Sequence, residues 1–294
     1  MDHRRRGVPV RTRHRAFSDL HWLLAHPTRI STPYIFVTTF GWPKQVPDLL
    51  LAALAGLIGG AMNALAGGGT FATMPALIAL GLPSPIANAT SNVALQPGAM
   101  SAAWGFRDGL EPLGGISIRT LAAITFAGGL VGSALLVITP TRTFDVIIPW
   151  LLLIAFLAIA FGKTAADWLR SRVSIGAPTL MISQGILGLY GGYFGGGVGI
   201  MTTATYGLLA GMPPHRLMAP RTLMLAVANT AAAILFISFG MVRWWVCLPM
   251  TGGAIIGGWL GAHYGRMLSP RLIRVWTLLV TATTTIVFFA RAYG

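Results

Sequence analysis

Acidic residues and cysteine are scarce in this chain of 294 residues. Seven Asp and Glu residues stand against 21 Lys and Arg residues, and charged residues make up 10% of the chain, where a soluble domain has about 25%. The single cysteine, Cys247, excludes an internal disulfide framework and a cysteine-rich metal site. Hydrophobic residues, in contrast, reach 54%, and the mean hydropathy is +0.70. This composition predicts an all-α integral membrane protein.

Basic residues gather at the N-terminus, before the first long apolar run. Residues 1–47 carry eight Lys and Arg residues, and we expect them to form a basic cytoplasmic tail that faces anionic lipid rather than nucleic acid. A mitochondrial-type presequence is the alternative interpretation of this stretch. The expected location is the cell (inner or plasma) membrane, with a multi-pass chain and a cytoplasmic N-terminus.

Windows without charged residues mark the predicted membrane spans, because a charge at the bilayer centre costs at least about 2.5 kcal/mol. The first and fourth windows are too long for one span of roughly 20 residues, and both contain glycine-rich stretches. The windows cover residues 49–106, 120–141, 146–162, 173–215, 222–242, 244–265 and 275–290.

The glycine-rich stretches are two copies of one pattern. "GLIGGAMNALAGGGTFATMPALIALGLPSP" (56–85) matches "GLYGGYFGGGVGIMTTATYGLLAGMPPH" (188–215), and "GGLVGSALL" (128–136) matches "GGWLGAHYG" (257–265). The pattern predicts two homologous repeats of about four transmembrane helices, each with a glycine-broken, re-entrant first helix. The predicted domains are the tail at 1–47, repeat 1 at 48–162, a linker at 163–178 and repeat 2 at 179–294.

Helix breaks inside a membrane have a chemical consequence. They expose backbone N–H and C=O groups, which persist only where protein or a wet cavity satisfies them. A half-helix that starts at Thr70, or near Thr202, would direct free N–H groups and the positive end of its dipole at a ligand. The expected ligand is a small anion.

In both copies the order of these motifs resembles the sulfite exporter TauE/SafE family, also called TSUP. The resemblance covers residues 48–290 and includes the glycine-rich break, the Gly-Leu-Pro or Gly-Met-Pro turn, the following "ANATSNVA" or "APRTLMLA", and the Gly-Gly-x-x-Gly helix. It implies a multi-span inner-membrane permease that moves small sulfur-containing anions such as sulfite or organosulfonates.

The candidate substrate-binding residues lie beside the breaks or in the helices that follow them. On a helix, Asn88, Asn92 and Gln96 share one face, which would form a donor-rich wall. The alternative is that such polar side chains join helices through hydrogen bonds. The candidates are Asn63, Gly68, Gly69, Thr70, Thr90, Ser91, Asn92, Gly197, Gly199, Thr202, Arg221, Thr222 and Asn229.

Two titratable residues stand out among the predicted spans. Arg221 aligns with Ser91 of the first copy, and its guanidinium would bind a sulfonate or carboxylate through two N–H donors. The alternative is an arginine at the membrane surface, since 222–242 can span without it. His263 is a candidate proton relay, or else a hydrogen-bonded histidine at a helix end. No metal and no cofactor is expected.

The predicted function is a secondary carrier for a small anion, with an anion channel built on half-helices as the alternative. An enzyme is not expected, because the chain has no His-Glu-x-x-His and no Gly-x-Ser-x-Gly motif. Charge favours eight spans, with the tail and linker both cytoplasmic; ten spans would invert the repeats and put the linker outside. A homodimer is compatible with the sequence.

Overall fold

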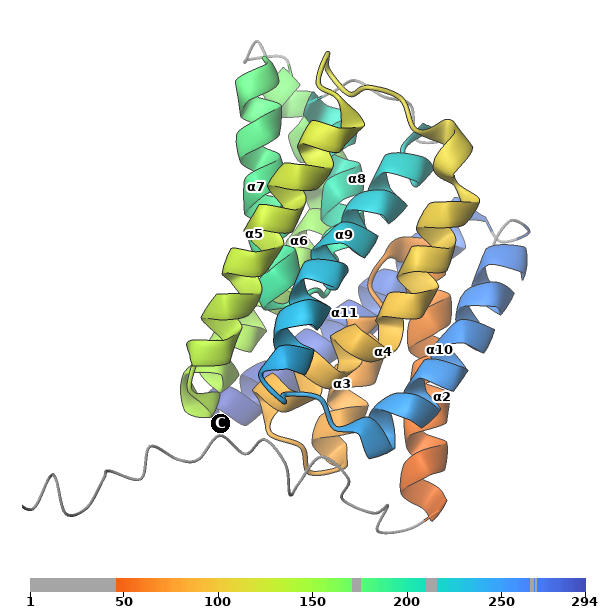
Figure 1. Cartoon of the computed structure of the whole chain (residues 1–294), viewed down its shortest axis with the longest axis vertical. Helices are drawn as coiled ribbons and strands as arrows, with labels where there is room; N and C mark the ends of the chain where they lie inside the picture. Colours follow the sequence, from red (N-terminus) through yellow and green to blue (C-terminus); the bar gives the residue numbers. More distant parts are fainter. Residues whose placement is uncertain (1–45, 171–175, 210–215, 265–266, 268) are drawn as a thin grey trace, which may run out of the picture. The chain divides into compact units, whose positions relative to one another are not determined.

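The computed structural model describes residues 46–170, 176–209, 216–264, 267 and 269–294 (Figure 1). The predicted basic tail, apart from its last two residues, and positions 171–175 of the predicted linker lie outside this part of the chain. The described elements are helical apart from one isolated bridge between Leu113 and Ile116, so the all-α class is confirmed. They are α2 (Val46–Ala66), α3 (Thr70–Ala79), α4 (Ser84–Gly105), η1 (Arg107–Gly109), α5 (Ile118–Ile138), α6 (Thr141–Arg170), α7 (Ala177–Tyr193), α8 (Val198–Leu209), α9 (Met218–Ser238), α10 (Trp244–Tyr264) and α11 (Pro270–Tyr293).

Three glycines separate α2 from α3. Gly67 has a φ of 74°, a left-handed conformation that glycine adopts without a Cβ clash, and the chain turns there. A Cβ atom on Gly59 would meet both Thr73 and Gly69, so α3 returns along α2 in the opposite direction. The connection between α7 and α8 has the same chemistry, with φ values of 76° at Gly195 and 79° at Gly197.

The two connections touch each other. A Cβ atom on Gly67 would lie 2.7 Å from the Cα of Gly199, and one on Gly199 would lie 2.9 Å from the Cα of Gly67. Side chains cannot fit at this distance, so both positions need glycine for close approach as well as, at Gly67, for its dihedral angle. The two glycine-rich turns therefore meet inside the protein.

Glycine also lets whole helices pack backbone to backbone. A Cβ atom on Gly56 would overlap Met250, and one on Gly60 would overlap Ala254. The contacts advance together along both helices, so α2 and α10 run parallel. The helices α5 and α7 pair in the same manner. The glycines that meet backbone there are Gly128, Gly132, Gly188 and Gly192.

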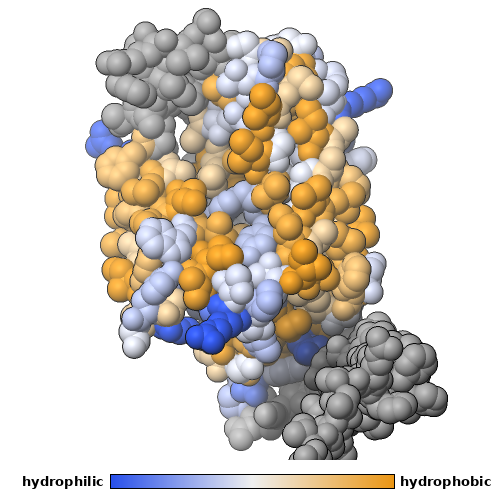
Figure 2. All heavy atoms as spheres, turned by 90° about the vertical axis from the view of Figure 1, so that its left-hand side faces the viewer, coloured by the Kyte–Doolittle hydropathy of each residue, from blue (hydrophilic) through white to orange (hydrophobic). Residues whose placement is uncertain are grey.

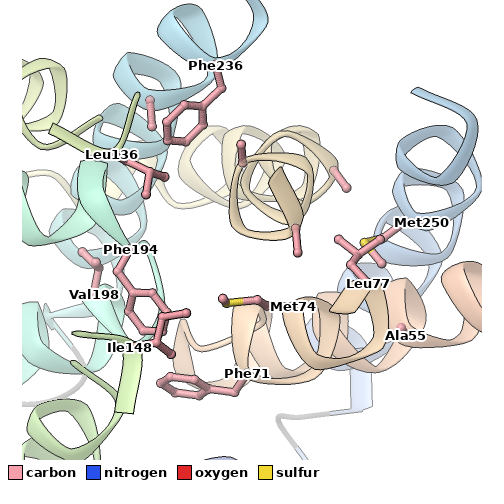
Figure 3. Close-up of a cluster of buried hydrophobic side chains, with 14 of the residues drawn as sticks. Ala55, Phe71, Met74, Leu77, Leu136, Ile148, Phe194, Val198, Phe236 and Met250 are labelled. Atoms are coloured by element: carbon pink, nitrogen blue, oxygen red, sulfur yellow. The ribbon is translucent and has the colours of Figure 1, made fainter. Parts of the chain in front are cut away.

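The short helix α3 lies within the largest core cluster. Figure 3 shows Phe71 and Met74 of α3 among Phe194, Val198 and Ile148, which come from the α7–α8 connection, α8 and α6. Phe71 and Met74 are each 2% exposed. The burial explains how a helix of only ten residues persists, because tertiary packing supplies the stability that a short helix lacks.

Six helices are long and apolar enough to cross a membrane: α2, α5, α6, α9, α10 and α11, counted within the described residues. The expectation was eight spans. The difference comes from α4, whose 22 residues include several Asn, Ser, Thr and Gln side chains, and from α7, which has only 17 residues. Hydrophobic side chains cover most of the face that carries α5 and α7, with strongly hydrophilic ones mainly toward its two ends (Figure 2). This surface fits a multi-pass membrane protein.

Candidate functional site

A cavity of about 870 Å³ lies between helices from both halves of the chain. Its walls are the last turns of α2, the second half of α4, the first half of α9 and the second half of α10, with Ile273 of α11. Most wall side chains are apolar, including Leu95, Leu225, Ile255 and Trp259. The polar lining residues are Asn63, Ser101, Arg221 and Thr222.

Arg221 is the charged residue of this wall. It belongs to the first turn of α9 and is 6% exposed, so its side chain is buried within the protein rather than spread over the surface of the helix bundle. Its Nη2 donates to the carbonyl oxygen of Ala64, 3.3 Å away, while its buried Nε has no hydrogen-bond partner within the described part of the chain. Among the described residues it forms no ion pair. The result is a buried cation with spare donor capacity beside a cavity.

Thr222 and Asn63 flank Arg221 in the cavity wall. The Thr222 hydroxyl donates to the carbonyls of Met218 and Ala219, at 2.9 and 3.0 Å, so its proton is committed within α9. Asn63, three residues before the end of α2, is half-buried. Three of the predicted site residues are therefore brought together around one cavity: Asn63, Arg221 and Thr222.

The other predicted site residues lie apart from the cavity walls. Gly68, Gly69 and Thr70 are buried in the α2–α3 turn. The α3 start offers less than a full turn of free N–H groups, because the amides of Phe71 and Thr73 donate to the carbonyls of Gly68 and Gly69. On the other side, Gly197 and Gly199 belong to the α7–α8 turn and the start of α8, and Thr202 to the next turn of α8, where its hydroxyl is buried without a partner.

Two of the predicted α4 residues join helices. The hydroxyls of Ser91 and Thr73 lie 2.5 Å apart, which ties α4 to α3. The hydroxyl of Thr90 accepts a hydrogen bond from the backbone N–H of Arg243, at 3.1 Å, just before α10. These contacts match the interhelical role that was the alternative for such residues.

The shared face of Asn88, Asn92 and Gln96 lies against α9 and the end of α7. Each carboxamide nitrogen is already used: Asn88 donates to the carbonyl of Tyr193, Asn92 to Asn229 Oδ1, and Gln96 to Ala226 and Thr230. All three carboxamide oxygens are buried and have no partner among the residues that the structure describes. The groups left free on this face are therefore the three carboxamide oxygens and the second N–H of Asn88 and of Asn92, and the donor-rich wall stays a prediction.

His263 lies in the last turn of α10 and is exposed, stacked on Trp259 with ring centroids 5.5 Å apart. It is not part of the cavity wall. A smaller pocket of about 310 Å³ adjoins the cavity and shares Gly105, Phe106 and Met218 with it. An exposed ion pair between Arg216 and Glu111, at 3.4 Å, lies at this rim.

Sequence reasoning missed the cavity wall contributed by α10. The Gly-Gly-x-x-Gly motif there predicts helix packing, and Gly257 does meet the backbone of Leu57. The neighbouring Gly258 and Trp259 instead face the cavity. When a helix packs on one side and lines a cavity on the other, residue type alone does not tell which of its residues face the cavity. No cluster of metal-ligating side chains occurs in the part of the chain that the structure describes.

Comparisons with known proteins show one family and several membrane transporter relatives. A family model described as sulfite exporter TauE/SafE matches residues 52–288. The chain is 27% identical over 259 residues to the probable membrane transporter protein YfcA of Escherichia coli (strain K12), covering 87% of this chain and 96% of the relative. A probable membrane transporter protein of Haemophilus influenzae is 29% identical over 242 residues, with coverages of 80% and 93%. The probable membrane transporter protein ORF9 of a Sinorhizobium species is 28% identical over 243 residues, with coverages of 81% and 91%. No solved structure matches the chain significantly.

Proposed function

Because the chain belongs to the sulfite exporter TauE/SafE family of membrane transporters, we propose that it is a secondary carrier for a small anion, which binds beside Arg221. Its substrates would be sulfite, an organosulfonate, or a related sulfur-containing or carboxylate compound. The carrier acts in the cell membrane, and its N-terminus lies in the cytoplasm. Neither catalysis nor a cofactor is part of this proposal.

The observation that carries the proposal is the unpaired guanidinium of Arg221 beside the cavity. A buried cation without a counter-ion is costly, and an anion in the cavity would neutralise it through charge-assisted hydrogen bonds. Nη2 is tied to Ala64, which fixes the plane of the guanidinium, while Nε has no partner. A sulfonate or carboxylate matches the paired donors of such a group.

The rest of the cavity wall favours an anion that carries an apolar part. Leu95, Leu225, Ile255 and Trp259 line the volume around one charged residue, and bare sulfite offers nothing to these side chains. We therefore rank organosulfonates and carboxylates with a short apolar body above sulfite as substrates.

The helix pairings support two inverted repeats, which is the arrangement that alternating access uses. If α2 to α6 correspond in order to α7 to α11, the pair α2 with α10 becomes the pair α7 with α5, and both pairs pack through glycine. In this arrangement α2 with α3 and α7 with α8 are re-entrant hairpins from opposite membrane faces. Helices α4, α5, α6, α9, α10 and α11 then cross: this set contains the polar α4 and leaves out α2, although α2 is apolar and long enough to span. The linker then lies opposite the N-terminal tail.

Transport in liposomes tests the function directly. Purified protein should take up a sulfonate or a carboxylate with saturable kinetics and should exchange internal for external substrate. Arg221→Gln should abolish this flux. Arg274→Gln is the matched control, because Arg274 also donates to a helix carbonyl, that of Ala160 at 2.8 Å, but is exposed at the outside of the bundle.

Two results would count against the carrier. Conductance far above the turnover of carriers would indicate the channel instead. An absence of flux and of binding for sulfite, sulfonates and carboxylates would refute anion transport altogether.

A further inference from the structure

The buried face of α4 carries a column of oxygen acceptors. Ser84, Asn88, Asn92 and Gln96 follow one another at intervals of four residues, so they lie along one face of the helix. The oxygens Asn88 Oδ1, Asn92 Oδ1 and Gln96 Oε1 are all buried, in side chains that are 1%, 3% and 8% exposed, and no described residue pairs with them. Buried acceptors of this kind are nearly always satisfied in proteins, so the column indicates a ligand that provides positive charge or N–H or O–H donors.

The orientation of the carboxamides follows from their partners. A backbone carbonyl can only accept a hydrogen bond, so the group that faces the carbonyl of Tyr193, 3.1 Å away, must be the nitrogen of Asn88. The same holds for Gln96, whose nitrogen faces the carbonyl of Ala226 at 3.2 Å. For Asn88 and Gln96 the unpaired atoms are therefore oxygens, and exchanging the two ends of either amide would remove a hydrogen bond.

Two of these carboxamides lie against the turn that joins α7 to α8. Asn88 binds Tyr193, the last residue of α7, and the nitrogen of Asn92 lies 3.2 Å from where a Cβ atom on Gly195 would be. The C-terminal end of a helix carries partial negative charge, and unwound backbone adds carbonyl oxygens. Both side-chain contacts to this end of α7 are made by carboxamide nitrogens, so it is the backbone carbonyls of the helix end that favour a cation beside the two carboxamides.

The corresponding end of α2 already has its cation. The guanidinium of Arg221 donates to the carbonyl of Ala64 in the last turns of α2. At the end of α7 the described residues supply asparagine in place of a basic side chain. Arg221 aligns with Ser91 in the repeat pattern, next to Asn92, so the second site lacks the fixed positive charge that the first possesses.

An acidic residue lies at the outer end of the column. The hydroxyl of Ser84, in the first turn of α4, donates to Asp145 Oδ1 of α6. Phe144, the residue before Asp145, packs edge-on against Tyr193, with ring centroids 5.6 Å apart. Asp145 is therefore close to both the beginning of the column and the α7 end, where a carboxylate would attract a cation.

We propose that Na⁺ binds between Asn88 Oδ1, Asn92 Oδ1 and backbone carbonyl oxygens of the α7–α8 turn. Hard cations prefer carbonyl and carboxamide oxygens, and a set of neutral ligands suits one positive charge better than two. The bound Na⁺ supplies at the end of α7 the positive charge that Arg221 supplies at the end of α2. Na⁺ binding does not depend on the proposed function. The coupling of Na⁺ to anion transport rests on that function.

Thermal unfolding of the purified full-length protein tests the binding. The melting temperature is measured in NaCl, KCl and choline chloride at equal ionic strength and without an anionic substrate. Na⁺ at about ten times its Kd should raise the melting temperature by roughly 3 °C or more relative to choline. Equal melting temperatures in all three salts would refute the site.

Variants assign the effect to these residues. Asn88→Ala and Asn92→Ala should each abolish the Na⁺ shift, while Asn92→Asp should keep it and lower the Na⁺ concentration needed, because a carboxylate adds charge. Gln184→Ala is the matched control: this buried carboxamide has both ends paired, with Thr125 and Tyr206 at 2.6 Å. Gln184→Ala should lower the melting temperature in every salt and should retain the rise in melting temperature that Na⁺ causes.

Two outcomes separate this inference from the proposed function. Saturable anion flux that is the same in Na⁺ and choline, with no Na⁺ shift, would refute the cation site and leave the carrier intact. If Asn88→Ala and Asn92→Ala keep the full Na⁺-dependent rise in melting temperature, the ion binds elsewhere. If the alanine variants do not fold, Asn92→Asp decides: no decrease in the Na⁺ concentration that it needs would refute the assignment.

Discussion

Arg221 and Ala64 lie 157 positions apart in the chain, yet they share a hydrogen bond. The guanidinium Nη2 of Arg221 donates to the carbonyl oxygen of Ala64 near the end of α2, 3.3 Å away. This bond joins the first turn of α9 to the last turns of α2. One edge of the guanidinium is therefore held by the protein backbone, which orients the rest of the group toward the cavity. Rotation of this group costs a hydrogen bond, so the anion meets a preorganised partner.

Replacement of Arg221 by Lys separates charge from geometry. Lysine keeps the positive charge but cannot hold the Ala64 carbonyl and present two further donors in one plane. Hydrogen bonds to charged groups contribute about 1.5–3 kcal/mol each, so Arg221→Lys should weaken anion binding by roughly 10- to 100-fold. Titration with the transported anion, followed by tryptophan fluorescence or calorimetry, measures the loss. Affinity equal to that of the native protein would show that only the charge matters.

Gly252 and Gly253 in α10 are neighbours with opposite surroundings. A Cβ atom on Gly253 would overlap the backbone of Ala53 in α2, while one on Gly252 would meet nothing within 4 Å. Gly253→Ala should therefore destabilise the protein by about 1–3 kcal/mol through overpacking. Gly252→Ala should be neutral or more stable by up to about 1 kcal/mol, because alanine favours the helix. The melting temperatures of the two variants decide this, and a loss of the same size in both would contradict the packing.

Gly67 and Gly81 share a left-handed backbone but not a neighbourhood. The φ of Gly81 is 86°, and a Cβ atom there would meet no described atom within 4 Å, whereas a Cβ atom on Gly67, whose φ is 74°, would lie 2.7 Å from the Cα of Gly199. Gly81→Ala should cost only the conformational term of about 1–2 kcal/mol. Gly67→Ala should cost clearly more and should also reduce transport, because the two turns must move apart.

Both losses can be followed by thermal unfolding and by flux in liposomes. If Gly67→Ala behaves like Gly81→Ala in both assays, the contact between the two turns contributes nothing beyond the dihedral angle.

Cysteine labelling tests the inverted arrangement. In a Cys247→Ala background, single cysteines replace Ser117, Ser269 and Thr141, which are all exposed next to helix starts. With inverted repeats and six crossings, positions 117 and 269 react with an impermeant thiol reagent from the same side of the membrane, and position 141 reacts from the other. Eight spans with parallel repeats would put 117 and 269 on opposite sides.

The sequence predicts backbone features well in this protein. The turns at Gly67 and at Gly195 to Gly197 coincide with its glycine-rich stretches, because left-handed dihedrals and close approach are local demands that glycine alone meets. The packing of Gly128 and Gly132 follows from the same logic. The number of apolar spans is harder to predict from the sequence. Helix α4 is polar because its side chains bond to other helices, and the sequence does not show those partners.

Side-chain roles depend on distant neighbours, and here the sequence alone falls short. Nothing near Asn88 tells that its nitrogen will meet the carbonyl of Tyr193, 105 positions away. That contact uses one N–H of the carboxamide and leaves its oxygen buried without a partner among the described residues. Likewise, the spacing of "GGWLGAHYG" does not reveal that His263 faces outward while Gly258 lines the cavity.

The exchange of helix partners between the halves of the chain has a consequence for biosynthesis. During translation the glycine groove of α2 stays uncovered until α10 has been made, nearly two hundred residues later, and that of α5 waits for α7. Neither half can close its own grooves. When the two halves are produced as separate polypeptides, each alone should be degraded, and the pair, made in the same cell, should assemble and accumulate.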